Sequence, residues 1–184
     1  INDNDEIQVS SVMIENNSGK IIALTGGRNY EKSQYNRAIS SKRQVGSTMK
    51  PFLYYAALEN GFTASSTFLS EPTTFSLDNN TTYSPTNFGN IYPGHPIPLL
   101  LAISYSDNIF AIKTHLFLGE DAIVNVAKKS GIKTNLPKNV SLPIGTTELS
   151  ITEFTSAYST LANEGKKNDN YFLNTNFNNY EKVF

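Results

Sequence analysis

Three apolar, helix-forming runs of this chain each end at a glycine, which limits where its helices can lie. These runs and their glycines are 47–60 with Gly61, 120–130 with Gly131, and 151–164 with Gly165. Glycine favours helix ends because it adopts the left-handed backbone conformation without steric cost. Ser150-Ile151-Thr152-Glu153 has the spacing of a capping box, which predicts where the last of these helices begins.

The remaining segments are predicted from turn residues and composition. Two β-branched, apolar-rich runs flank Asn16-Asn17-Ser18-Gly19, a pattern that predicts a hairpin of residues 7–26. A further helical run at 98–118 is interrupted near residue 107. The composition of 27–45 and 62–97 is typical of loops, and the tail gives only a weak strand prediction at its end.

Composition restricts the class of protein. The 184 residues are 39% hydrophobic, which suits about one globular domain, and the scattered charges sum to −1. This charge pattern argues against a nucleic-acid partner, which would require a concentrated basic face. The absence of cysteine excludes disulfides and thiol chemistry. His95 and His115 are too few for a histidine-rich metal site, so we expect no metal and no cofactor.

The segment Gly46-Ser47-Thr48-Met49-Lys50 carries the first candidate for chemistry. Three residues are close to one helical turn, so Ser47 and Lys50 would share a helix face. A serine hydroxyl is a weak nucleophile until a base takes its proton, and a desolvated lysine can be that base. The spacing alone is not specific, because Ser130-Gly131-Ile132-Lys133 repeats it; there Gly131 ends a helix, and we interpret that copy as chance.

The second candidate is Ser106-Asp107-Asn108, the one Ser-x-Asn of the sequence. Such residues compete with helical backbone bonding, so the trio fits a break between two helical pieces. A break would present the Ser106 hydroxyl and the Asn108 amide to a cleft, where they could relay a proton and hold a substrate carbonyl. The simpler interpretation is that the trio caps the helix after it.

Several stretches around these candidates resemble the transpeptidase domain of class A penicillin-binding proteins. They are Gly26-Gly27-Arg28-Asn29-Tyr30, Gln34-Tyr35-Asn36-Arg37-Ala38, Arg43 to Phe52, Tyr83-Ser84-Pro85-Thr86-Asn87-Phe88, Ala102 to Asn108, Ala157-Tyr158 and Leu161 to Gly165. Ser-x-x-Lys and Ser-Asp-Asn occur together in penicillin-binding proteins and in class A β-lactamases. The resemblance covers most of residues 7–165, and the motifs stand in the family's order.

The resemblance implies an α+β fold, with an antiparallel sheet flanked by helices and an all-α part that carries Ser47 and Ser106. Residues 1–184 would be the N-terminal portion of the domain. The implied activity is a serine D,D-transpeptidase that cross-links peptidoglycan stem peptides ending in D-Ala-D-Ala. Ser47 would form the acyl-enzyme, Lys50 would be the base, Ser106 would return a proton and Asn108 would hold the peptide and Lys50. β-Lactam antibiotics would acylate the same serine.

The family's third motif, Lys-Thr-Gly, is absent from the end of this sequence. Lys129-Ser130-Gly131 is a poor substitute because it ends a predicted helix, whereas the family's motif lies on a strand. We therefore expect a complementary C-terminal segment with Lys-Thr-Gly to complete the site. The resemblance also implies the extracytoplasmic face of a bacterial cell membrane, with an anchor outside this chain. No apolar run among the 184 residues approaches the roughly 20 residues of a membrane span.

Other differences from the family are smaller. Met49 stands in place of phenylalanine and Val45 in place of proline, while Leu99-Leu100-Leu101 replaces a more polar stretch. We expect this leucine run to be core, because such runs are usually buried. Two alternatives to the transpeptidase stay open: a serine β-lactamase or D,D-carboxypeptidase, in which water resolves the acyl-enzyme, and a non-catalytic penicillin-binding sensor or scaffold.

Overall fold

The computed structural model describes residues 7–77 and 81–172. The described residues fall into two units. We call residues 7–43, 128–134 and 149–172 the hairpin unit, and residues 44–77, 81–127 and 135–148 the helical unit. The strand expected at the end of the tail lies outside the described residues.

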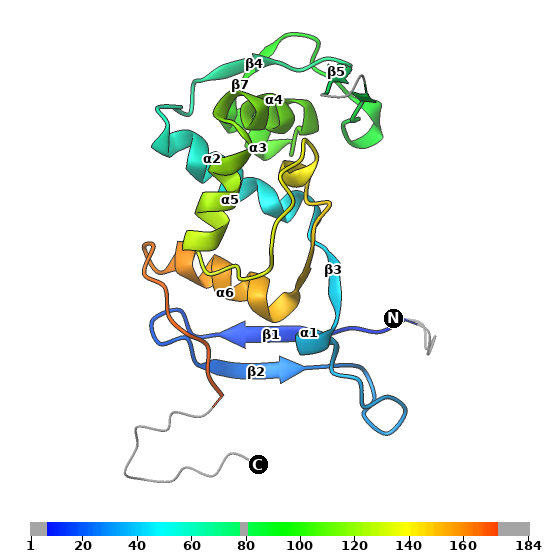
Figure 1. Ribbon diagram of the computed structural model, residues 1–184. Coiled ribbons are helices and arrows are strands. Elements are labelled where there is room, and N and C mark those ends of the chain that lie inside the picture. The colour runs from blue at the N-terminus through cyan, green and yellow to red at the C-terminus, as the bar shows by residue number, and fades with distance from the viewer. Residues whose placement is uncertain (1–6, 78–80, 173–184) are drawn as a thin grey trace. The chain divides into compact units, whose positions relative to one another are not determined.

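The hairpin unit is built on the predicted antiparallel pair. β1 (Ser11–Ile14) pairs with β2 (Ile21–Thr25), with Ser11 opposite Thr25. α6 (Ile151–Ala162) packs along β1 (Figure 1) and buries Ala157. The strands are shorter than the apolar runs in the sequence, but the hairpin and the helix stand where the sequence predicts them.

The hairpin turn requires a glycine for two reasons. Gly19 has φ +80°, in the left-handed region, and its N–H donates to the Glu15 carbonyl at 2.9 Å. A Cβ at this position would also lie 2.5 Å from the carbonyl oxygen of Asp169. That close approach accompanies an isolated bridge between Lys20 and Tyr171, so the tail lies directly against the turn.

The prediction of a plain loop at 27–45 is wrong in part. α1 (Arg37–Ser40) begins where the Asn36 side chain accepts a hydrogen bond from Ala38 N–H at 3.1 Å. β3 (Lys42–Gln44) follows and pairs with β8 (Glu148–Ser150). Elements of three or four residues are too short to show a hydrophobic period, which explains why the sequence pattern does not reveal them.

The helical unit holds most of the described helices. Its helices are η1 (Gly46–Met49), α2 (Lys50–Glu59), η3 (Phe88–Asn90), α3 (Leu99–Ser104), α4 (Asn108–Leu118), α5 (Glu120–Lys129, within this unit up to residue 127) and η4 (Leu142–Ile144). α2 and α4 pack against each other and against η4, and Phe52, Phe110 and Leu142 are fully buried there. The predicted stop of α2 before Gly61 and the predicted break between α3 and α4 are both confirmed.

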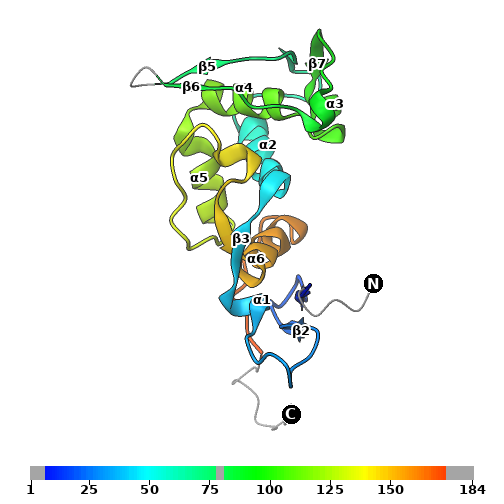
Figure 2. The same ribbon diagram turned by 90° about the vertical axis from the view of Figure 1, so that its right-hand side faces the viewer.

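The region 62–97 contains short strands where a loop was predicted. β4 (Thr67–Leu69) pairs antiparallel with β7 (Pro96–Pro98), and β5 (Phe75–Ser76) pairs with β6 (Thr82–Tyr83). β4 packs against α4, and Figure 2 shows the β5–β6 pair above α4 as well. Prolines stand at both ends of β7, which conceals a strand because proline cannot donate to a ladder. Pairing across nearly thirty residues also leaves no local signal.

The expectation that Leu99-Leu100-Leu101 is core is wrong for two of its three residues. Leu99 is buried, but Leu100 is 61% exposed and Leu101 is also exposed. α3 is only six residues long, so a continuous apolar run necessarily places side chains on both its inner and outer faces. Within the described residues, no helix is both long and apolar enough to cross a membrane.

The capping box at the start of α6 is only half formed, because Glu153 has other partners. Ser150 Oγ accepts from Glu153 N–H at 3.2 Å, as the motif predicts. The Glu153 carboxylate instead accepts from Lys133 N–H and Thr134 N–H, both at 2.7 Å, and from Thr134 Oγ1 at 2.8 Å. Burial by itself raises the pKa of Glu153, but these hydrogen bonds outweigh it and hold the pKa below its ordinary value.

We expect Glu153→Gln to lower the free energy of unfolding by about 1–2 kcal/mol, because an amide cannot accept all three hydrogen bonds. Urea unfolding of the full-length protein at pH 7 measures this loss. The difference from wild type should shrink as the pH falls below 4.5, since a carboxylate with a lowered folded-state pKa stabilises the fold only while it is ionised.

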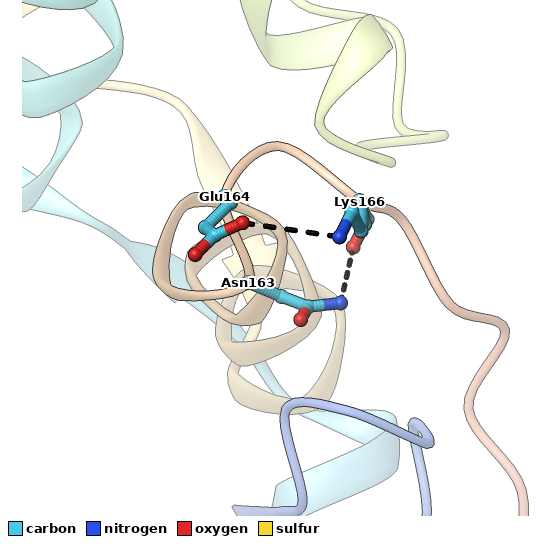
Figure 3. Close-up of polar contacts among 3 residues, drawn as sticks. All are labelled: Asn163, Glu164 and Lys166. Carbon is cyan, nitrogen blue, oxygen red and sulfur yellow. Dashed lines mark hydrogen bonds and ion pairs between the residues drawn. The ribbon is translucent and has the colours of Figure 1, made fainter.

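Glu164 gives the matched control for that experiment (Figure 3). Its carboxylate lies 3.8 Å from Lys166 Nζ, and both side chains are exposed. Exposed ion pairs of this kind contribute little, so Glu164→Gln should leave the unfolding free energy almost unchanged. Equal losses from the two substitutions would contradict the role given to Glu153.

Candidate active site

Ser47 lies in η1, immediately before α2, and its side chain is exposed. Two backbone hydrogen bonds hold this turn: Val45 N–H donates to the Thr147 carbonyl at 3.1 Å, and Gly46 N–H donates to the Gly145 carbonyl at 2.9 Å. Gly145 packs so closely that a Cβ there would lie 1.9 Å from the Gly46 carbonyl oxygen. Sequence reasoning did not identify Gly145 as part of the site. The only indication in the sequence is that this glycine stands in a stretch with no predicted helix or strand.

Lys50, at the start of α2, is only 3% exposed. Its Nζ lies 2.5 Å from the Ser106 carbonyl oxygen, 3.0 Å from Ser106 Oγ and 2.7 Å from Asn108 Oδ1. The structure therefore brings three of the four predicted site residues into direct contact. Burial lowers the pKa of Lys50 to about 8, although the charge of Asp107 opposes this shift.

Ser47 shares a pocket with two of the other site residues. Ser47, Ser106 and Asn108 line one open pocket of about 760 Å³, together with Phe88 and Tyr105. In the described part of the chain, no side chain makes a hydrogen bond to Ser47 Oγ, and the bonds of Lys50 Nζ go to Ser106 and Asn108. Hydrogen bonds between a nucleophile and its base are often long without substrate, so this geometry is compatible with proton transfer.

The break between α3 and α4 is what presents Ser106. This residue has φ +54°, in the left-handed region that a serine rarely adopts. The conformation ends α3 and turns both the Ser106 carbonyl and its hydroxyl toward Lys50. Asp107 then caps α4 by accepting from Phe110 N–H at 2.7 Å, so the capping interpretation of the trio holds for its middle residue.

The loop that carries Tyr83 to Phe88 also belongs to the site, which sequence reasoning did not assign. Asn87 Oδ1 accepts from Asn108 N–H at 2.8 Å. The Thr86 carbonyl accepts from Asn108 Nδ2 at 2.7 Å, which turns Asn108 Oδ1 toward Lys50. The signal was present, because Tyr83 to Phe88 is one of the stretches that resemble the family.

The remaining candidates lie elsewhere in the chain. Gly131 has φ +107° and follows α5, so Ser130 and Lys133 do not share a helix. Ser130 is buried and Lys133 is exposed, and Lys129 is the last residue of a helix rather than part of a strand. His115 is buried, with Nε2 3.1 Å from the Asn139 carbonyl oxygen. Among the described residues, no three His, Asp or Glu side chains are placed to hold a metal.

Comparison with known proteins shows which family the chain belongs to. The family model described as "Penicillin binding protein transpeptidase domain" matches residues 9–182. This chain belongs to that family. Its relatives include class A penicillin-binding proteins: it is 44% identical over 174 residues to penicillin-binding protein 2D of Bacillus subtilis and 39% identical over 170 residues to penicillin-binding protein 1A of Pseudomonas aeruginosa.

A solved structure supports the same conclusion for the fold. The crystal structure of penicillin-binding protein 1A from Haemophilus influenzae superposes with a TM-score of 0.78 at 32% identity, over 83% of this chain and 23% of that one. The α+β transpeptidase fold, incomplete in this chain, is thereby confirmed. The two sequence matches span 94% and 90% of this chain, but only 25% and 20% of the relatives' own length.

Proposed function

We propose that this chain is the N-terminal portion of a serine D,D-transpeptidase domain that acts through an acyl-enzyme at Ser47. One observation carries the proposal: a buried lysine with a lowered pKa is held by Ser106 and Asn108, and these two residues line a pocket together with the exposed Ser47. Family membership supports the reaction class, because transpeptidation is an acyl transfer. The substrate would be a peptidoglycan stem peptide ending in D-Ala-D-Ala.

In the proposed reaction, neutral Lys50 takes the proton of Ser47 as Oγ attacks the carbonyl between the two terminal D-alanines. The tetrahedral intermediate then collapses and breaks the peptide bond. Ser106 Oγ, 3.0 Å from Lys50 Nζ, relays the proton to the departing D-alanine amine. The amine of a second stem peptide then attacks the Ser47 ester and loses a proton to Lys50. Lys50 returns this proton to Ser47 Oγ as the ester C–O bond breaks, which completes the cross-link and frees the serine.

Asn108 has two tasks in this proposal. Its Oδ1 holds Lys50 Nζ at 2.7 Å, and its position on the pocket wall allows it to contact the stem peptide. A complementary segment with Lys-Thr-Gly would complete the site and supply N–H donors for the oxyanion. Backbone N–H donors of that kind typically contribute two to three orders of magnitude to the rate of acyl transfer.

The proposal extends to β-lactams and to location. A β-lactam would acylate Ser47 through the same steps, but its leaving amine stays tethered, so the adduct should persist. A solved structure with a similar fold, at 22% identity, is that of PonA1 from Mycobacterium tuberculosis in complex with penicillin V. A transpeptidase acting on peptidoglycan would work at the extracytoplasmic face of the bacterial membrane.

The test is to label the full-length protein with a fluorescent penicillin and to map the adduct by peptide mass spectrometry. We expect a single adduct, on the peptide that contains Ser47, and none on heat-denatured protein. No adduct, or an adduct on another residue, would overturn the proposal. Rapid turnover of a chromogenic cephalosporin would instead identify a β-lactamase, because water would then be resolving the acyl-enzyme.

A further inference from the structure

A buried carboxylate lies directly behind the proposed site, and capping alone does not account for it. Asp107 is 3% exposed, and only its Oδ1 serves as the cap of α4. Its Oδ2 accepts from Ser70 Oγ at 2.5 Å and from Asn87 Nδ2 at 2.7 Å. Asp107 makes no ion pair with another described residue. A serine or asparagine would cap the helix equally well, so the charged second oxygen has a separate structural consequence.

That consequence is the orientation of the Asn87 amide. A carboxylate can only accept hydrogen bonds, so the nitrogen of Asn87 must face Asp107. The same nitrogen also donates to the Ile91 carbonyl at 3.2 Å. Oδ1 of Asn87 therefore points the other way, where it accepts from Asn108 N–H at 2.8 Å. Asn87 is buried, so a reversed amide would leave unpaired polar atoms away from water.

The orientation of the Asn108 amide in turn affects Lys50. Asn87 follows Thr86, whose carbonyl accepts from Asn108 Nδ2 at 2.7 Å. That bond fixes the Asn108 amide with its oxygen toward Lys50 Nζ. A reversed Asn108 would place an N–H₂ group against the lysine amine, which would remove one of its three acceptors. The contacts thus connect Asp107 to Asn87 and its neighbour Thr86, these two residues to Asn108, and Asn108 to the base Lys50.

We infer that Asp107 and Asn87 are positioning residues of the acylation step, which set the orientation of Asn108 and thereby hold Lys50 ready to take the Ser47 proton. This inference rests on the proposed function. The Asp107 charge also favours protonated Lys50 and so raises its pKa against the effect of burial. Removing the charge should consequently change the pH dependence of acylation as well as its rate.

The experiment measures the second-order acylation rate constant of the full-length protein with a fluorescent penicillin, from pH 6 to pH 10. Each rate is normalised to the fraction of molecules that label at saturation, so that a loss of folded protein does not affect the comparison of rates. The variants are Asp107→Asn, which keeps a helix cap but sets an amide against Asn87, and Asn87→Ala. Asp121→Asn is the control, because it removes an exposed carboxylate from the first turn of α5.

We expect both site variants to lower the plateau rate roughly 10- to 100-fold, as displaced catalytic groups typically do. The midpoint of the pH profile should move to lower pH in Asp107→Asn, and Asp121→Asn should match wild type. Normalised rates and midpoints equal to wild type, with only the labelled fraction reduced, would overturn the inference and leave the network a purely structural role. Wild-type protein without a Ser47 adduct would overturn the proposed function itself.

Discussion

Replacing Lys50 by methionine is expected to slow acylation of Ser47 by a β-lactam about 10²- to 10⁴-fold, the range that loss of a general base usually produces. Methionine approximates the length of the lysine stem, so the buried position stays filled while the amine is lost. The second-order rate constant for a fluorescent penicillin, measured on the full-length protein, gives the effect. Ser47→Ala supplies the zero-acylation baseline.

The wild-type pH profile tests the same assignment. A base acts when it is neutral, so the acylation rate should rise with pH and reach half its plateau near pH 8, the pKa of Lys50. Lys50→Arg should remain slow at every pH, because a guanidinium does not give up its proton in this range. A profile that stays flat from pH 6 to pH 10 in wild type would contradict lysine as the base.

The chain provides its own control for that substitution. Ser130 and Lys133 repeat the Ser-x-x-Lys spacing, but Lys133 is exposed and follows a glycine with φ +107°. In the Lys133→Met variant, Ser47 should therefore be acylated at the wild-type rate. A loss comparable to that of Lys50→Met would show that the spacing has been interpreted wrongly.

The comparison of these two copies shows how far sequence reasoning reaches. Spacing predicts that a serine and a lysine share a turn, but it does not predict burial, and burial is what gives Lys50 its lowered pKa. The helix ends at Gly61 and Gly131 were predictable because glycine conformation is a local property. The break at Ser106 was predictable for a similar reason, since its neighbours favour caps over helix interiors.

What the sequence did not reveal depends on contacts between distant residues. Asn87 reaches Asn108 across 21 positions, and β4 pairs with β7 across nearly thirty. No local period or turn preference encodes such contacts, and only the resemblance to the family drew attention to Asn87. The exposure of Leu100 is another case, because apolar character predicts burial only where a packing partner exists.

Gly145 is the clearest example of a residue whose role depends on a contact with a distant part of the chain. Gly145→Ala is expected to reduce the acylation rate about 10²-fold. An added Cβ would lie 1.9 Å from the Gly46 carbonyl oxygen and 2.4 Å from its nitrogen. These are backbone atoms, so the turn that carries Ser47 must move to relieve the clash. Acylation needs the Ser47 oxygen within reach of both base and carbonyl, and a shift of about 1 Å is enough to prevent this.

Gly165→Ala separates displacement of the turn from backbone strain. Gly165 has φ +79°, close to the φ +74° of Gly145, but no atom lies within 4 Å of a Cβ built on it. Both substitutions place an alanine in the left-handed region and should cost about 1–2 kcal/mol of stability for that reason. Only Gly145→Ala pushes against the residue before the nucleophile, so only it should slow acylation per folded molecule. Equal rates in the two variants would mean that the Ser47 turn absorbs the clash without moving its hydroxyl.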